Sequence, residues 1–308
     1  MVKTLKLYII AKEGAIWSRE IATLSAIHRA LLTSPQPLPN IEFAFNADDS
    51  VDPVAIWGYA RRAQDESIWL IPDFGYWSWP EPKIGSAKEV QDEAIWAEEN
   101  EGLSWRKKNK KLLWRGVPGM GPAIRDKLLE VTAGQSWADV KALSWSDPDS
   151  KAHDYKTMPE HCKYRYVAQT EGNTYSGRLK YLQSCRSVVV SHELDWIQHH
   201  YHLMQSSGPE QNFVEVRRDW ADLKEKIQWL QKHDGEARRI ADNNVRMFRE
   251  RYLTPAAEVC YWRRLFREWA GVSAFEPPFF KKVNGKREWR GVPVESYLLM
   301  RERDWEMA

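Results

Sequence analysis

The segment of residues 171–178 reads Glu-Gly-Asn-Thr-Tyr-Ser-Gly-Arg and lies between a predicted strand and a predicted helix. Gly172 permits a turn, Ser176 can cap the next helix, and Gly177 lets a ligand come close to the backbone. Free N–H groups at a helix start, together with the guanidinium of Arg178, suit a diphosphate. A capped helix that carries a surface arginine is an equally good interpretation of the segment taken alone.

A second glycine-containing turn follows another predicted strand, at residues 114–123. Its sequence, Trp-Arg-Gly-Val-Pro-Gly-Met-Gly-Pro-Ala, imitates in part a dinucleotide-binding turn, in which glycines admit a phosphate to a helix N-terminus. The match is incomplete because no acidic residue lies clearly at the end of the next strand, and a plain tight turn is the simpler interpretation. Arg115 and Arg125 supply positive charge there in either case.

Two further groups of polar residues follow predicted strands. Four histidines lie within residues 192–202, but Trp196 occupies the place of the second histidine of a zincin motif. The four histidines are still compatible with a metal site, although a helix with solvated imidazoles is the more common arrangement. Asp195 or Glu193 is placed to bond ribose hydroxyls.

The adjacent acids Asp48 and Asp49 follow the apolar segment 41–45. Such a pair most often forms a solvated turn. These two carboxylates also lie where a general base would be needed if the active site is the cleft between two α/β halves.

The elements that must position these residues alternate along the chain. Strands are predicted at 5–11, 41–45, 67–71, 111–115, 164–168, 187–191 and 213–216, and helices at 17–32, 122–131 (opened by Pro122), 177–183, from Asp219 to about 230, at 235–252 and at 254–271. This order predicts a parallel sheet with helices on both faces, and ligands bind such sheets outside the carboxyl ends of the strands. The charged segment 87–111 is either the connection between two halves or a solvated helix.

The composition excludes several classes of protein. The 308 residues include 45 Lys and Arg against 43 Asp and Glu, a net charge of +2, which disfavours a nucleic-acid binder held by charge. The mean hydropathy is −0.62, and no apolar run approaches the roughly 18–20 residues of a membrane helix. The chain has 17 Trp, and packing in hydrophobic cores explains this number more readily than aromatic binding surfaces do. Its three cysteines form no zinc motif, and their number leaves reduced thiols or one disulfide open.

Residues 161–190 resemble the signature of glycosyltransferase family 90. They begin His-Cys-Lys-Tyr-Arg-Tyr-Val-Ala and continue, after two residues, as Glu-Gly-Asn-Thr-Tyr-Ser-Gly-Arg-Leu-Lys-Tyr-Leu-Gln-Ser-Cys-Arg-Ser-Val-Val-Val. The likeness runs from about residue 5 to residue 270. It is supported by Trp-Arg-Gly at 114–116, Asp-Trp at 195–196 and Cys-Tyr-Trp at 260–262. The family includes fungal capsule-associated xylosyltransferases and animal protein O-glucosyltransferases of the Rumi and KDEL-motif type, and the Ser-Gly-Arg form and the 73–80 loop look closest to fungal members.

The resemblance implies a GT-B fold, an α/β architecture of two Rossmann-like domains that face each other across a cleft. The expected parts are an N-terminal acceptor-side domain (1–105), a nucleotide-sugar-binding domain (106–253), a helix that packs back on the first domain (254–275) and a peripheral tail (276–308). It also implies transfer of a sugar, xylose or glucose, from a UDP-sugar to a hydroxyl of a glycan or protein, with inversion, no required metal and no cofactor. The alternative is an inactive member that binds carbohydrate or serves as a scaffold.

The resemblance implies roles for individual residues. The UDP-sugar contacts are Arg115, Gly116, Arg125, Ser176, Gly177, Arg178 and Asp195. Asp49 matches the catalytic base, with Asp48 as the alternative because the family's usual Pro after the aspartate is absent here. Without a metal, arginines and a helix N-terminus must stabilise the leaving UDP. Because sugar rings stack on indoles, Trp77 and Trp79 are candidates for a sugar-binding wall.

The resemblance also bears on the cysteines and the compartment. Cys162 and Cys185 match a pair that is disulfide-linked in animal members, as expected for the Golgi or endoplasmic reticulum lumen. Cys260 matches a cysteine whose partner lies in an N-terminal segment that this chain lacks. The chain is therefore expected to be a catalytic domain without its membrane anchor and first helices. Glu171 takes the place of an Arg in animal members, a difference that alters sugar choice or has no effect.

Overall fold

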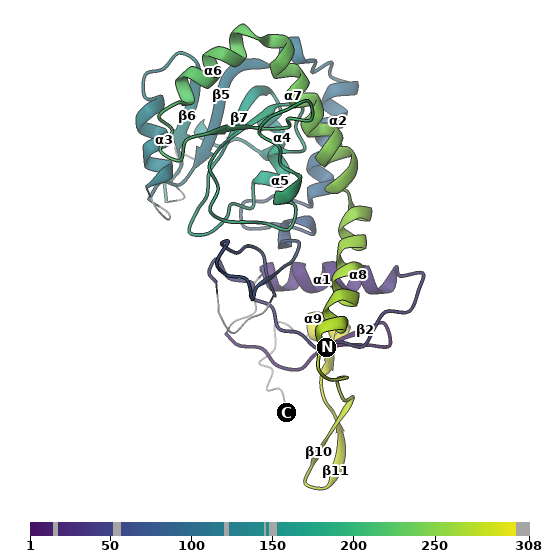
Figure 1. Cartoon of the computed structure of the whole chain (residues 1–308). Helices are drawn as coiled ribbons and strands as arrows, with labels where there is room; N and C mark the ends of the chain where they lie inside the picture. Colours follow the sequence, from purple (N-terminus) through teal and green to yellow (C-terminus); the bar gives the residue numbers. More distant parts are fainter. Residues whose placement is uncertain (15–17, 52–56, 120–122, 145, 148–152, 300–308) are drawn as a thin grey trace.

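A five-stranded parallel sheet is the largest sheet in the described part of the computed structural model and lies in the upper part of the view (Figure 1). The structure describes all residues except 15–17, 52–56, 120–122, 145, 148–152 and 300–308. Across the sheet the strands are β6 (Ala138–Ala142), β5 (Asn109–Gly116), β7 (Tyr164–Gln169), β8 (Val188–His192) and β9 (Val214–Val216). Four of these strands were predicted, and β6 was missed. The mixed α/β class with a parallel sheet is confirmed.

Helices cover both faces of this sheet because alternate side chains of each strand point to opposite sides. One face packs against α3 (Ile124–Thr132), α6 (Leu223–Lys232) and α7 (Asp234–Met247), and the other against α5 (Leu179–Leu182). Along β5, Leu112 and Trp114 belong to the first core and Leu113 to the second. We call this part, residues 109–247, the sheet unit.

A second core gathers elements from both ends of the chain, and we call it the α1 unit. Its elements are β1 (Val2–Lys3), β2 (Lys6–Ile9), α1 (Ser18–Leu32), β3 (Trp57–Gly58), β4 (Trp69–Leu70), η1 (Phe74–Tyr76), α8 (Pro255–Val272), β12 (Val292–Pro293) and α9 (Val294–Leu299). The strand expected at 41–45 is reduced to isolated bridges of Ile41 with Val2 and of Phe45 with Trp57. The described strands of the α1 unit pair only over short stretches, in an antiparallel sheet of β1, β2 and β12 and a parallel pair of β3 and β4.

The helix α8 connects the two units (Figure 1). It follows α7 through the π-helical turn η5 (Phe248–Tyr252) and begins where the hydroxyl of Thr254 accepts a hydrogen bond from the backbone N–H of Ala257. Trp262 and Phe266 on its buried face are fully enclosed in the core of the α1 unit. The sheet unit is thus joined to the α1 unit by continuous helical structure.

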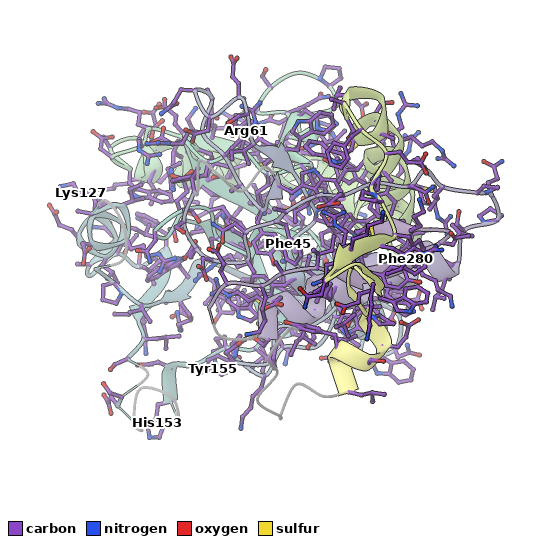
Figure 2. All side chains as sticks on the ribbon, turned by 90° about the horizontal axis from the view of Figure 1, so that it is seen from below. Phe45, Arg61, Lys127, His153, Tyr155 and Phe280 are labelled. Atoms are coloured by element: carbon purple, nitrogen blue, oxygen red, sulfur yellow. A yellow bond between two sulfur atoms is a disulfide. The ribbon has the colours of Figure 1, made fainter. Side chains whose placement is uncertain are left out.

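Part of the tail expected to be peripheral lies in a core. Val294 and Tyr297 of α9 are buried in the α1 unit, and β12 pairs with β2. Within the described part of the tail, the hairpin of β10 (Phe280–Val283) and β11 (Lys286–Trp289) is the part that projects from the molecule (Figure 1). In the view from below, Phe280 of this hairpin and Lys127 of α3 lie at opposite sides (Figure 2).

Several boundaries differ from the predicted ones. The segment 87–111 contains a helix, α2 (Ala87–Glu99), opened by a capping box of Ser86 and Glu89. The helix predicted from Asp219 begins four residues later as α6, since the Asp219 carboxylate accepts a hydrogen bond from the N–H of Ala221 within a turn. The helix expected at 177–183 shrinks to the four residues of α5, and Pro122 lies outside the described residues.

None of the helices in the described part of the chain has the length and apolar character needed to cross a membrane.

Candidate functional site

A cavity of about 680 Å³ lies where the carboxyl end of the sheet meets the α1 unit. The sheet unit contributes the residues that follow β5 and β7, and the α1 unit contributes α1, the loop after residue 45 and the aromatic loop near η1. Of the residues predicted to form a site, Asp48, Asp49, Trp79, Arg115, Gly116, Arg125, Ser176, Gly177 and Arg178 line it. Trp77 and Asp195 do not.

Arg178 brings to this cavity a guanidinium that pairs with no carboxylate of the described residues. Its Nη1 donates to the backbone oxygen of Arg115 (2.6 Å) and its Nε to Oγ of Ser176 (3.3 Å). Its guanidinium carbon lies 5.5 Å from the centre of the Trp114 ring. Burial and the charge of Arg125 lower the pKa of Arg178, yet arginine stays protonated at neutral pH. A half-buried cation without a counter-charge favours an anionic ligand.

Arg115 has a different role, because its guanidinium is held by the protein itself. It donates to the backbone oxygens of Asp154 (2.7 Å), Trp114 (2.9 Å) and Asp139 (2.5 Å) and to Oδ1 of Asp139 (2.7 Å). These bonds use four of the roughly five N–H groups of a guanidinium. Arg115 therefore shapes the cavity wall and holds Arg178 through its backbone oxygen.

Two glycines allow the arginines to approach the backbone. A Cβ atom on Gly116 would lie 2.6 Å from the Trp114 ring and 3.0 Å from Nη2 of Arg178. A Cβ atom on Gly172 would lie 3.0 Å from Nη2 of Arg125. Gly116 and Gly172 thus serve to seat two guanidinium groups, whereas Gly121 of the dinucleotide-like turn lies outside the described residues.

Arg125 lies beside the carboxylate of Asp49. Its Nε donates to the backbone oxygen of Glu171 (2.9 Å) and its Nη1 to that of Val117 (3.0 Å). Burial lowers the pKa of Arg125, while the charge of Asp49 opposes that shift. The two side chains therefore interact electrostatically at one end of the cavity.

The carboxylate of Asp49 is oriented across the boundary between the units. Its Oδ1 accepts a hydrogen bond from the hydroxyl of Thr174, which belongs to the turn after β7. Asp48 is more exposed, and its backbone N–H donates to Oδ1 of Asn46 (2.8 Å). Of the two acids, only Asp49 has a described contact that fixes its carboxylate next to the arginines.

The two tryptophans proposed for sugar stacking are separated. Trp79 lines the cavity, and its ring lies 3.5 Å from the position that a Cβ atom on Gly177 would take. Trp77 is 39% exposed and stacks under the guanidinium of Arg29, 5.1 Å from its ring centre. Only Trp79 is placed to contact a ligand in this cavity.

Asp195 is held away from the cavity by a network around Glu171. Oε1 of Glu171 accepts from the backbone N–H groups of Asp195 and Trp196 (2.8 Å each), and Arg218 pairs with both carboxylates. Burial raises the pKa of Glu171. The side chain of Glu171 therefore supports the turn after β8, and only its backbone oxygen, through Arg125, touches the cavity wall.

Of the four histidines within residues 192–202, His192 and His200 are buried, and the segment has no helix beyond the short η4 (Tyr201–Leu203). Nε2 of His192 accepts from the N–H of Glu171 (3.0 Å), and Nε2 of His200 lies 3.0 Å from Oε1 of Gln183. The solvated-helix prediction is therefore wrong. In the described part of the chain, no three His, Cys, Asp or Glu side chains are grouped to hold a metal ion.

Three buried histidines, His161, His192 and His200, make the stability of the fold depend on pH. Burial lowers the pKa of His161 and His192 to about 4 and that of His200 to about 3. Between about pH 6.5 and pH 4 the unfolded histidines bind protons and the folded ones do not, so acid favours unfolding. We expect the free energy of unfolding to fall by about 3 kcal/mol per histidine over this window, measured by urea titration at several pH values. A flat profile from pH 6.5 to 4.5 would contradict it.

A buried ion pair joins the units beside the cavity. Nζ of Lys180 lies 2.7 Å from Oδ1 of Asp73, with both side chains 2% exposed, and it donates to the backbone oxygen of Gly177 (2.7 Å). Lys180 thus holds the turn that carries Arg178.

Replacing Asp73 by asparagine is expected to lower the free energy of unfolding by about 3–5 kcal/mol, because it leaves a buried ammonium without its counter-charge. Asp92→Asn, which breaks an exposed pair with Lys88, serves as the control and should cost less than about 0.5 kcal/mol. Thermal and urea unfolding measure both. A loss below about 1 kcal/mol for Asp73→Asn would contradict the assigned role.

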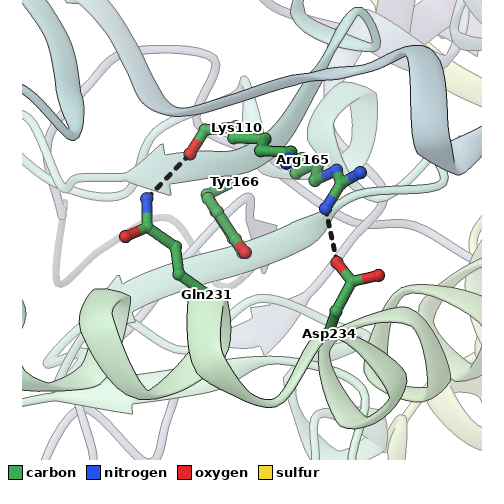
Figure 3. A pocket seen from close by; sticks show the side chains of 5 residues that line it. All are labelled: Lys110, Arg165, Tyr166, Gln231 and Asp234. Atoms are coloured by element: carbon green, nitrogen blue, oxygen red, sulfur yellow. Dashed lines mark hydrogen bonds and ion pairs between the residues drawn. The ribbon is translucent and has the colours of Figure 1, made fainter.

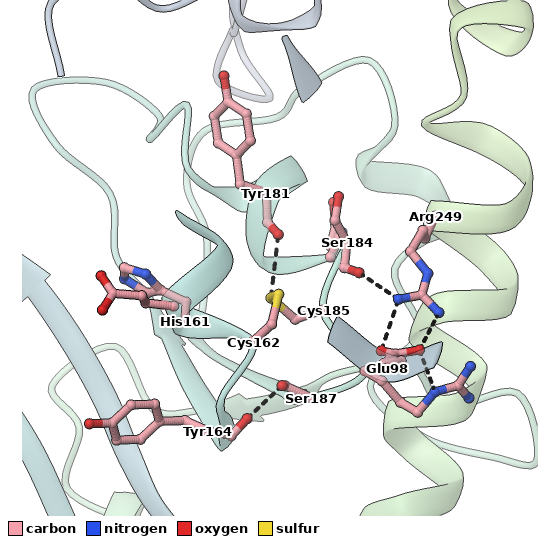
Figure 4. The surroundings of a disulfide bond; sticks show 12 residues. Glu98, His161, Cys162, Tyr164, Tyr181, Ser184, Cys185, Ser187 and Arg249 are labelled. Carbon is pink, nitrogen blue, oxygen red and sulfur yellow. Dashed lines mark hydrogen bonds and ion pairs between the residues drawn. A yellow bond between two sulfur atoms is a disulfide. The ribbon is translucent and has the colours of Figure 1, made fainter. Parts of the chain in front are cut away.

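A disulfide between Cys162 and Cys185 ties the end of α4 (Met158–His161) to the end of α5 (Figure 4). The bond lies under α2, against Ala94. Cys260 is free and exposed. The disulfide therefore fixes two segments that flank the cavity.

Sequence reasoning missed two cavity residues, Arg19 and His161. Arg19 lies in the first turn of α1, with its guanidinium carbon 4.9 Å from the centre of the Phe74 ring and no ion pair to a described carboxylate. His161 ends α4 and is 2% exposed. No motif marks Arg19, which reaches the cavity only through the packing of the units, whereas His161 opens the segment 161–190 but was assigned no role there.

A smaller hollow at the amino ends of β5 and β7 is closed by its own polar contacts (Figure 3). Arg165 pairs with Asp234, and the side-chain amide of Gln231 donates to the backbone oxygen of Lys110 (3.1 Å). These contacts tie the sheet to α6 and α7.

Comparisons with known proteins agree with these observations. A family model described as Glycosyl transferase family 90 matches residues 1–285. Protein O-glucosyltransferase 2 of Danio rerio is 26% identical over 261 residues, which cover 80% of this chain and 50% of the relative. Protein O-glucosyltransferase 1 of Homo sapiens is 24% identical over 275 residues, which cover 80% of this chain and 66% of the relative. The O-glucosyltransferase rumi homolog of Aedes aegypti is 27% identical over 256 residues, which cover 78% of this chain and 58% of the relative. The matches thus cover between half and two thirds of each relative's length.

Proposed function

The chain belongs to glycosyltransferase family 90, and on that premise we propose that it moves a sugar from a UDP-sugar to a hydroxyl of a glycan or protein, with inversion and without a metal. The names of the relatives support glucose as the sugar, and xylose is the other candidate. The proposal includes a GT-B arrangement in which residues 1–105 form the acceptor side and residues 106–253 bind the nucleotide sugar. It is supported by a cavity lined from both parts.

The observation that carries the proposal is the guanidinium of Arg178, which forms no ion pair with a described carboxylate and lies in the cavity that Asp49 also lines. A diphosphate would supply the missing negative charge, and Arg178 is oriented for it by Ser176 and by the backbone of Arg115. When the bond from the sugar to UDP breaks, negative charge grows on the diphosphate. A fixed guanidinium stabilises that charge without reorganisation.

Asp49 is the proposed base. The acceptor hydroxyl gives its proton to the Asp49 carboxylate, its oxygen bonds to the anomeric carbon, and UDP leaves from the opposite face with the bonding electron pair. The hydrogen bond from Thr174 holds the carboxylate in place. Trp79 offers an indole face to a sugar ring within the same cavity. A protein acceptor would fit an oxidising lumen, which the buried disulfide also supports.

The test is UDP release from UDP-glucose, UDP-xylose and UDP-galactose, with and without EDTA, beside calorimetry with UDP. We expect UDP to bind, and one donor to be turned over equally in EDTA. UDP binding without turnover of any donor would favour an inactive family member that binds carbohydrate. Absence of both binding and release would overturn the proposed function.

A further inference from the structure

His161 lies at the wall of the cavity with one ring nitrogen unused. Its Nδ1 lies 2.8 Å from the backbone oxygen of Thr157, a carbonyl that can only accept. Nδ1 therefore carries the proton, and Nε2 keeps its lone pair. Nε2 is buried and has no hydrogen-bond partner among the described residues. A buried acceptor without a partner costs free energy, which a ligand that donates to it would recover.

The surroundings of the ring keep it neutral and fixed. Burial lowers the pKa of His161 to about 4, and the charges of Arg178 and Arg115 contribute in the same direction. The next residue, Cys162, is held by the disulfide, and the imidazole points away from that bond (Figure 4). Near neutral pH the side chain offers one acceptor atom in a set position, beside the guanidinium assigned to the diphosphate.

We propose that Nε2 of His161 accepts a hydrogen bond from an uncharged O–H or N–H donor of the nucleotide sugar and so helps to select it. The donor group is either a hydroxyl of the transferred sugar or a group of the uridine, its imide N–H or a ribose hydroxyl. The inference rests on the proposed function, since it assumes a nucleotide sugar in this cavity. It gives a specificity role to His161, the first residue of the segment 161–190, for which the resemblance implied no role.

The experiment compares wild type, His161→Phe and His161→Gln for binding of UDP and UDP-glucose by calorimetry, with thermal unfolding of each. Phe keeps a ring and removes the acceptor, whereas Gln keeps an acceptor oxygen. We expect His161→Phe to weaken UDP-glucose about tenfold and His161→Gln to restore most of the loss. Equal weakening of UDP places the donor group on the uridine, and unchanged UDP binding places it on the sugar.

Three outcomes would overturn the inference. The first is that His161→Phe binds both ligands no more than twofold more weakly than wild type. The second is that both variants are weakened equally, as a packing role would produce. If wild type itself binds neither ligand, the proposed function fails and the inference fails with it. The unfolding curves show whether a weakened variant is still folded.

Discussion

Replacing Arg178 by alanine is expected to raise the Kd for UDP by at least about 100-fold. Charge-assisted hydrogen bonds contribute about 1.5–3 kcal/mol each, and a guanidinium can make two to a diphosphate. Arg178 has no carboxylate partner among the described residues, so its loss leaves no buried acid uncompensated. Calorimetry with UDP measures the effect. Arg178→Lys should recover part of the affinity, because lysine keeps the charge and loses the forked geometry.

Two further variants sharpen that result. Gly116→Ala adds a Cβ atom against the Trp114 ring and Nη2 of Arg178, so it should weaken UDP binding while the guanidinium is still present. Arg264→Ala, on the exposed face of α8, removes an arginine far from the cavity and should change nothing. If Arg178→Ala binds UDP within about threefold of wild type (about 0.6 kcal/mol) and unfolds normally, the diphosphate is held elsewhere.

Replacing Asp49 by asparagine is expected to leave UDP binding within a few-fold of wild type and to lower transfer by about 100-fold or more. An amide cannot take the proton of an acceptor hydroxyl, and a positioned base contributes about 10²–10⁴-fold. Its side-chain oxygen can still accept the hydrogen bond from Thr174, so the position is retained. UDP release in the presence of acceptor, beside calorimetry, separates the two effects.

Asp48→Asn is the matched control for that variant. It changes a neighbouring, more exposed acid of the same cavity and should keep most of the activity. The reverse result, with transfer lost in Asp48→Asn and kept in Asp49→Asn, would show that the base is one residue earlier.

The parts of the site that could be predicted from the sequence are those formed by a strand and the turn directly after it. Ser176, Gly177 and Arg178 belong to the turn between β7, which ends at Gln169, and α5, so local patterning places them at the carboxyl end of the sheet. The role of Arg115 could not be predicted, because its partners on β6 and near residue 154 are distant in the sequence.

The first third of the chain was harder to predict for a related reason. Its described strands are two to four residues long, and their pairings join distant segments, such as β2 with β12. Short strands carry little periodicity, and pairing partners at the far end of the chain leave no local mark. Asp195 was expected at the cavity because it follows β8, but Glu171 turns that loop away through two backbone N–H groups.

The buried pair of Asp73 and Lys180 has a consequence for how ligands reach the cavity. Drawing the α1 unit away from the sheet unit would separate the two charges where little water reaches them. At about 3–5 kcal/mol, such a separated state would hold less than about one molecule in a hundred. On the proposed function, we therefore expect the donor to enter and UDP to leave while the two units stay held together.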